Sequence, residues 1–142
     1  MRKLVVAAAT VAIFALLVSP ASSAPGGGGR TVAKISFMGS ETTRTTTWTP
    51  GDQVTFAVDP VGVKDRDLYH LWVANSCTQD GVNTYVQYLP VTYSSYRVGQ
   101  AGAFTVSSPS WTSSPASCTA FVWNFSQGLN PLAGATLTYA VS

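Results

Sequence analysis

Cys77 and Cys118 are the residues with the most specific chemistry in this sequence of 142 residues. A redox or metal-binding pair needs a close spacing such as C-x-x-C, whereas these two cysteines lie 41 positions apart. In an oxidising compartment, two distant cysteines most simply form one structural disulfide. We therefore predict a Cys77–Cys118 bond, which stabilises the folded state by about 4 kcal/mol in the chain-entropy model.

His70 is the only histidine in the chain. It could act as a general base only beside a nucleophile and an orienting carboxylate, and no Ser, Cys or Asp lies in a recognisable catalytic context. A blue-copper site would need two histidines, a thiolate and usually an axial methionine, but the chain after its N-terminal segment offers only His70 and Met38 besides the cysteines. We predict that the protein is not an enzyme and that it holds no metal and no cofactor.

The densest acidic cluster consists of Asp59, Asp65 and Asp67. Carboxylates at positions i and i+2 also occur in the calcium loops of extracellular β domains. Lys64 and Arg66 lie between these carboxylates, however, and would repel a divalent cation. We expect a solvated turn with local ion pairs here, with a calcium loop as the alternative.

Two aromatic-rich segments would each form a strand that is apolar on both faces. One face of residues 68–76 carries His70, Trp72 and Ala74, and the other carries Leu71, Val73 and Asn75. In residues 118–125, Phe121, Trp123 and Phe125 likewise oppose Cys118, Ala120 and Val122. We expect Trp72, Phe121 and Trp123 to fill the core. The alternative is an exposed aromatic platform that binds sugar rings or a protein.

Five more aromatic residues in the central and later segments are candidate ligand-binding residues. They could line a platform or groove, or they could support loops, and the sequence leaves both alternatives open. These residues are Tyr85, Tyr88, Tyr93, Tyr96 and Trp111.

The N-terminal segment has the three parts of a secretory signal peptide. Arg2 and Lys3 form a positive end, residues 4–18 form an apolar run, and residues 19–24 are small or helix-breaking. The apolar run is too short to span a bilayer comfortably, because a spanning helix needs about 20 residues. We predict a signal peptide over residues 1–24 and a secreted, extracellular protein without a stable membrane anchor. The alternative is an uncut N-terminal anchor.

Removal of residues 1–24 changes the charge balance of the chain. The full sequence has 8 basic and 6 acidic residues. Arg2 and Lys3 leave with the signal peptide, so the mature chain has no net charge. The positive excess of the precursor therefore belongs to the export signal, and neither nucleic acid nor an anionic membrane is an expected partner.

The mature chain of about 118 residues has the size of a single domain. Residues 25–30 are glycine-rich and are expected to form a flexible leader, followed by one domain over residues 31–142. Short β-branched and aromatic runs alternate with Gly and Pro in this domain. Strands are predicted at Thr31–Met38, Glu41–Thr49, Gln53–Asp59, Leu68–Ser76, Thr84–Pro90, Ala103–Ser107, Cys118–Phe125 and Ala135–Val141. About seven short strands indicate an all-β, antiparallel sandwich.

Two segments resemble a known family. The phrase Thr-Pro-Gly-Asp-Gln-Val-Thr-Phe at residues 49–56 is similar to the turn-into-strand motif Pro-Gly-Asp-x-Val-x-Phe of secreted bacterial immunoglobulin-like domains. Residues 118–123, Cys-Thr-Ala-Phe-Val-Trp, resemble a late core strand of such domains. In the first motif, Pro and Gly supply the turn dihedrals and Asp caps the turn. The resemblance implies an immunoglobulin-like β-sandwich and no particular activity, because one fold hosts many functions.

The resemblance also implies where the disulfide lies. Antibody-type domains join their two sheets by a bond between strands B and F, beside a core Trp on strand C. In this chain Trp72 precedes Cys77 by five residues, and both fall on the third regular strand. We therefore expect the Cys77–Cys118 bond to join the neighbouring strands C and F at one end of the sandwich.

These observations predict a secreted, non-catalytic binding or structural module that acts through protein–protein interaction. The alternative is a carbohydrate-binding module that uses exposed aromatic residues. The expected partner is accordingly an extracellular protein or a glycan.

Overall fold

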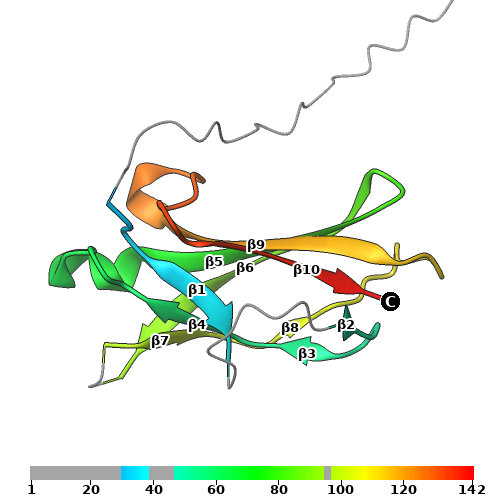
Figure 1. Cartoon of the computed structure of the whole chain (residues 1–142), viewed down its shortest axis with the longest axis horizontal. Helices are drawn as coiled ribbons and strands as arrows, with labels where there is room; N and C mark the ends of the chain where they lie inside the picture. Colours follow the sequence, from blue (N-terminus) through cyan, green and yellow to red (C-terminus); the bar gives the residue numbers. More distant parts are fainter. Residues whose placement is uncertain (1–29, 39–46, 95–96) are drawn as a thin grey trace, which may run out of the picture.

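The computed structural model describes residues 30–38, 47–94 and 97–142 (Figure 1). The predicted signal peptide, nearly all of the glycine-rich leader and most of the strand predicted at Glu41–Thr49 lie outside the described residues. Among the residues that are described, no helix is long and apolar enough to cross a membrane.

The regular secondary structure of the described residues is mostly β-strand, as predicted, with two short 3-10 helices. The strands are β1 (Lys34–Phe37), β2 (Thr47–Trp48), β3 (Gln53–Val54), β4 (Phe56–Asp59), β5 (Leu71–Gln79), β6 (Val82–Tyr93), β7 (Gly99–Ala101), β8 (Phe104–Thr105), β9 (Ala116–Asn124) and β10 (Thr136–Val141). Helix η1 (Asp65–His70) precedes β5, and helix η2 (Phe125–Gln127) follows β9.

Seven strands form one antiparallel sheet in the order β1-β4-β7-β6-β5-β9-β10, and β2 extends it through a parallel pairing with β10. A separate pair, β3 and β8, lies beside it. The sheet curls until it is nearly barrel-shaped, with β5, β6, β9 and β10 above and β1, β4, β7, β3 and β8 below in Figure 1. The long strand β6 pairs with β5 through residues 82–90 and with β7 through residues 91–93, so it belongs to both layers.

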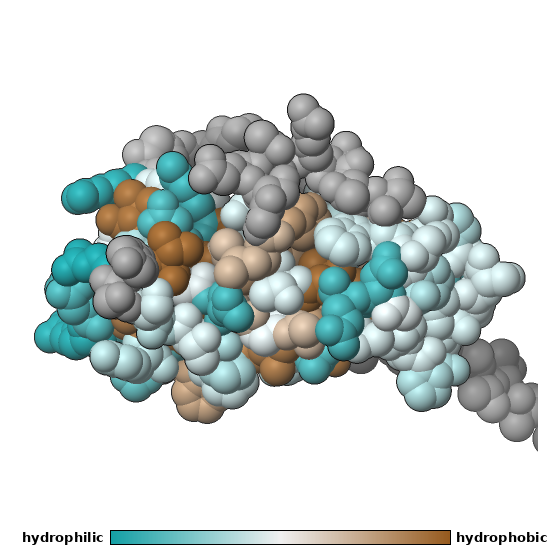
Figure 2. Space-filling model, turned by 90° about the horizontal axis from the view of Figure 1, so that it is seen from below, coloured by the Kyte–Doolittle hydropathy of each residue, from teal (hydrophilic) through white to brown (hydrophobic). Residues whose placement is uncertain are grey.

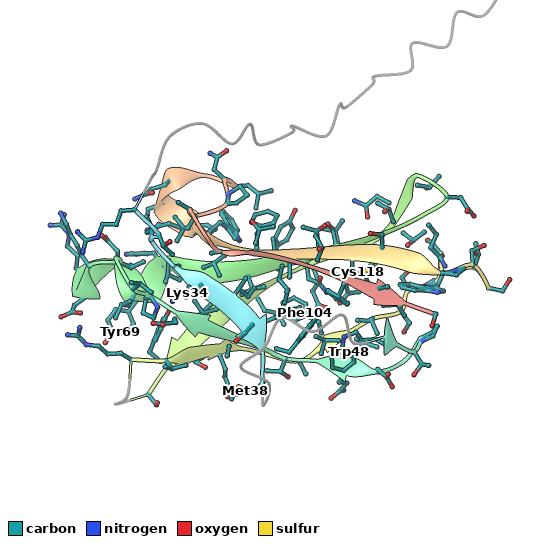
Figure 3. The ribbon with its side chains drawn as sticks, viewed as in Figure 1. Lys34, Met38, Trp48, Tyr69, Phe104 and Cys118 are labelled. Carbon is teal, nitrogen blue, oxygen red and sulfur yellow. A yellow bond between two sulfur atoms is a disulfide. The ribbon has the colours of Figure 1, made fainter. Side chains whose placement is uncertain are left out.

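The core lies between the layers and follows the alternation of the sequence. Val54, Phe56 and Val58 are fully buried, as the period of two in Gln53–Asp59 predicts. The ring of Phe56 meets the ring of Phe104 at a centroid distance of 5.4 Å, and that of Tyr139 at 6.0 Å. Figure 3 shows Phe104 pointing into the space between the layers.

The residues of the turn before β3 explain its conformation. Gly51 has a φ of 96°, which a residue with a side chain rarely adopts. The backbone N–H and the hydroxyl of Thr49 both donate to the carboxylate of Asp52, at 2.9 and 2.7 Å. These hydrogen bonds lower the pKa of Asp52. The turn therefore directs the chain into β3 with Val54 facing the core.

The Cys77–Cys118 disulfide is present and joins neighbouring strands, as predicted. Cys77 lies near the end of β5, Cys118 lies near the start of β9, and the two residues are directly opposite each other in the ladder. Both cysteines are completely buried. The bond therefore links two strands of one layer rather than the two layers.

Several predicted strand boundaries differ from the structure. Strand β6 extends beyond Thr84–Pro90 at both ends, and Phe125 belongs to η2 rather than to the strand predicted at Cys118–Phe125. Leu68, Tyr69 and His70 belong to η1 rather than to the following strand. Gln53–Asp59 is divided at Thr55, because β3 pairs with β8 whereas β4 pairs with β1 and β7. Finally, β7 occupies Gly99–Ala101, where no strand was predicted.

Candidate functional site

The outer face of β6, β5 and β9 carries a group of aromatic residues. The ladders place Trp72 of β5 between Pro90 of β6 and Trp123 of β9. One step along the same face, Ala74 lies between Tyr88 and Phe121. The opposite face of these strands carries the buried residues Leu71, Val73, Cys77, Cys118, Ala120 and Val122. We call Trp72, Tyr88, Phe121, Trp123 and Phe125 the outer aromatic surface.

Four of these rings pack against one another. Trp72 contacts Trp123 at a centroid distance of 6.5 Å, and Phe125 lies 5.8 Å from each of them. Tyr88 meets the ring of Trp123 edge-on at 6.0 Å. Trp123 is the floor of the group, with 9% of its surface exposed, whereas Tyr88 and Phe125 remain 43% and 61% exposed. The group therefore has an apolar floor and accessible rings above it.

The expectation that Trp72, Phe121 and Trp123 fill the core is wrong. All three lie on the outer face of the sheet, and the core is made by the other face of the same strands. The completely buried disulfide lies on this inward face, together with Leu71, Val73, Ala120 and Val122. The parity of Cys77 and Cys118 was thus the sequence signal for this arrangement.

A short turn after β9 places Phe125 over the tryptophans. The side-chain carbonyl oxygen of Asn124 accepts the backbone N–H of Ser126 at 2.9 Å and caps η2. Gly128 then adopts a φ of 87°, and the N–H of Leu132 returns to the carbonyl of Val122 at 2.8 Å. In Figure 1 this turn, in orange, rises above one end of the outer face, and the β5–β6 hairpin rises above the other.

The strands that form the outer face carry no ionisable side chain other than tyrosine. No Asp, Glu, Lys, Arg or His occurs in β5, β6, β9 or β10, or anywhere in residues 98–142. Several charged side chains lie instead on or near η1, where Asp65 pairs with Arg97 at 3.2 Å and Asp67 with Arg66 at 3.9 Å. Contacts on the outer aromatic surface must therefore be apolar or neutral hydrogen bonds.

Of the four candidate ligand-binding residues that the structure describes, only Tyr88 lies on the outer aromatic surface. Tyr85, Tyr93 and Trp111 are partly buried and pack against the core, and Tyr96 lies outside the described residues. The hydroxyl of Tyr85 donates to the side chain of Gln87, and burial raises the pKa of Tyr85 to about 12. Burial, with a smaller effect of Asp59, raises the pKa of Tyr93 above the usual range of tyrosine. A role of these residues in binding stays a prediction.

Two of the three carboxylates of the acidic cluster form ion pairs. Asp65 and Asp67 lie on η1, where their partners are Arg97 and Arg66. Within residues 30–38, 47–94 and 97–142, no group of three or more His, Cys, Asp or Glu side chains could hold a metal ion. His70 is exposed at the end of η1.

The remaining surface has open hollows of modest size. One of about 350 Å³ is lined by Met38, Tyr93, Val98, Gly99 and neighbouring residues of β6 and β7. Another of about 290 Å³ lies beside η1 and includes Lys64, Arg66, Leu71 and Asn124. The side of the molecule opposite the outer face, seen in Figure 2, mixes hydrophobic and hydrophilic residues in small patches. The outer aromatic surface is thus the more uniform candidate site.

Comparisons with protein-family models, with curated proteins and with solved structures gave no match to this chain.

Proposed function

We propose that this protein is a secreted, non-catalytic binding domain that holds a protein partner on the outer aromatic surface. The observation that carries the proposal is a sheet face that exposes aromatic rings and has no charged side chain. The centres of protein–protein interfaces are enriched in Tyr, Trp and Phe and depleted in charged residues. A contiguous apolar patch on a small protein marks such an interaction site.

The orientation of the rings favours a protein over a polysaccharide. Coplanar aromatic rings are best suited to bind a flat sugar chain. Here the ring planes of Trp72 and Trp123 are inclined to each other by 54°, and those of Tyr88 and Trp123 by 67°. An uneven surface of this kind suits the side chains of a protein, in which a bulky residue can enter between rings. Carbohydrate binding is the alternative outcome of the test below.

We also propose that the fold is immunoglobulin-like. Its support is the strand order: β1-β4-β7 would correspond to strands A, B and E, and β6-β5-β9-β10 to strands C′, C, F and G of a variable-type domain. In this correspondence the disulfide joins strands C and F. A buried disulfide also supports export to an oxidising compartment.

The proposal is tested with two variants that each remove one exposed aromatic ring. Phe125→Ala removes the most exposed ring of the outer aromatic surface, and Tyr69→Ala removes a ring of η1 that is 84% exposed and lies away from it. Neither change affects the buried core, so both variants should fold. Proteins captured by the immobilised wild-type chain are identified, purified and measured again by calorimetry.

We expect Phe125→Ala to weaken binding of the purified partner at least tenfold, as removal of a central aromatic residue does, and Tyr69→Ala to have no effect. Because the surface lacks charge, affinity should change little between about 50 and 500 mM salt. Equal loss with both variants, or no loss with either, would contradict the proposal. Retention on polysaccharides that only Phe125→Ala abolishes would establish the carbohydrate alternative instead.

A further inference from the structure

The free edge of β6 is a second feature of the upper layer; it borders the outer aromatic surface and shares Tyr88 with it. Residues 82–90 pair with β5 on one side, and β7 joins the other side only at residues 91–93. An unpaired strand edge offers backbone N–H and C=O groups to another chain. Natural edges are commonly protected by Lys, Pro or bulges. Strand β6 has no charged residue, and its proline, Pro90, and the irregularity of its ladder with β5 near Thr84 lie on either side of Val86 and Tyr88.

The hydrogen-bond pattern identifies which groups point outward. The N–H and C=O of Val122 bond to Ala135 and Leu132, on the side of β9 away from β5. Val122 therefore does not bond to Val73, its opposite residue on β5, and the two form a non-hydrogen-bonded pair. The backbone N–H and C=O of Val73 consequently point to the other side, toward its partner Leu89 on β6. Because such groups alternate along an antiparallel strand, Val86, Tyr88 and Pro90 direct their backbone groups away from β5.

Two residues limit the length of this edge. Pro90 has no N–H to donate. At the other end, the carbonyl of Thr84 already accepts the hydroxyl of Ser108. Within the described part of the chain, no hydrogen bond reaches the outward N–H and C=O of Val86 or Tyr88. The edge therefore presents two complete donor–acceptor sets, with one incomplete set at each end.

We propose that the occupant of this edge is the β6 edge of a second copy of the chain, paired antiparallel so that Val86 of each copy faces Tyr88 of the other. In this register all four N–H and C=O groups of Val86 and Tyr88 find partners, and Thr84 faces Pro90. Pro90 has no N–H to donate to Thr84, but the carbonyl of Thr84 already accepts a hydrogen bond from the hydroxyl of Ser108. A register shifted by two residues in one direction would pair Pro90 with Val86 and leave the carbonyl of Val86 without a donor. A shift in the other direction would pair Thr84 with Tyr88 and leave the N–H of Tyr88 with a carbonyl that Ser108 already occupies.

The side chains agree with this register. Val86 and Tyr88 lie on the outer face, so the pairing creates two β-branched–aromatic cross-strand contacts, which stabilise sheets. Gln87 would face Gln87 of the second copy at the two-fold axis, where two amides can bond to each other. Because β6 is uncharged, the two copies do not repel each other. The dimer would carry two outer aromatic surfaces on the same side of one continuous sheet.

The first test changes the outward hydrogen bonds alone. Val86→Pro removes an N–H that β5 does not use, so the internal ladder stays intact, whereas Val86→Thr keeps the N–H and serves as the control. The full chain is expressed, and the purified product is studied by sedimentation equilibrium over a range of concentrations. We expect a dimer that Val86→Pro weakens at least about tenfold and Val86→Thr leaves nearly unchanged. A wild-type protein that is monomeric up to about 1 mM, or a dimer equally stable in both variants, overturns the proposal.

The second test examines the register. Gln87→Cys should form an intermolecular disulfide on mild oxidation, because opposite residues in a non-hydrogen-bonded pair have the short Cα separation that a disulfide needs. In the same dimer, the two copies of position 82 lie roughly 30 Å apart, so Val82→Cys should not cross-link. Cross-linking at position 82, or none at position 87, overturns the register. Neither test involves a ligand, so failure here is distinct from failure of the proposed function.

Discussion

Replacing both cysteines, Cys77→Ala together with Cys118→Val, removes the covalent link between β5 and β9 and leaves only their ladder. The bond closes a loop between residues 41 positions apart. The loss of loop-closure entropy in the unfolded chain corresponds to about 4 kcal/mol at 25 °C. Because both side chains are completely buried, the smaller Ala side chain should add about 1 kcal/mol for lost packing. We expect the free energy of unfolding to fall by about 5 kcal/mol.

The change is measured by unfolding in urea, followed by tryptophan fluorescence and by circular dichroism. With a slope of about 1–3 kcal/mol per molar urea for a small domain, the unfolding midpoint should fall by roughly 2–5 M. Wild-type protein that has been unfolded and reduced, with its thiols kept reduced, is the control and should behave much like the variant. A midpoint lowered by less than about 0.5 M with an unchanged slope would refute the loop-closure argument for this bond.

Three further predictions concern the tyrosines and β7. Tyr139→Phe removes the hydroxyl that donates to Asn75 at 3.0 Å and should cost about 1–3 kcal/mol, measured by urea unfolding, because Asn75 is completely buried. Gly99→Ala should cost a similar amount, since a Cβ there would lie 2.6 Å from the ring of Tyr93, whereas Gly102→Ala meets only ordinary contacts and should be nearly neutral in thermal melting. Burial raises the pKa of Tyr139 to about 12 and raises the pKa of Tyr93 above the usual range. The folded state therefore keeps protons that the unfolded chain loses near pH 10, and urea midpoints should decrease from about pH 10 upward and not below it.

The sequence predicts the strands well where one face alone is apolar. In Gln53–Asp59 the period of two places Val54, Phe56 and Val58 on one face, and all three are fully buried. The disulfide and its position between neighbouring strands could also be predicted, because the chain has only two cysteines. These predictions rely on local patterns and on a count, and both are contained in the sequence itself.

The location of the outer aromatic surface could not be derived from periodicity alone. Both faces of β5 and β9 are apolar, so alternation separates Trp72 from Val73 without saying which one faces the core. The decision depends on the opposite layer, where Phe56 and Phe104 already supply large rings against the face of Val73 and Cys77. The two cysteines on the face of Val73 were the available sequence signal, and the assembled sheet shows that the tryptophans lie outside.

Strand β7 was missed for a different physical reason. Glycines are typical of turns, and Gly99 and Gly102 frame its short sequence. Gly99 lies opposite Tyr93 in the ladder, however, and its missing side chain leaves room for the ring of Tyr93. A glycine can thus mark close packing against a neighbouring strand, and this depends on a residue that lies opposite it in the ladder.

The division of β6 between the two layers has a consequence for how the protein unfolds. Since its first part pairs with β5 and its last residues pair with β7, neither layer can separate without breaking hydrogen bonds of the same strand. Unfolding should therefore be a single cooperative transition. Amide protons of β5 and β7 should exchange with deuterium through the same global opening. The free energy of opening measured by exchange should therefore be the same for the two strands that flank β6.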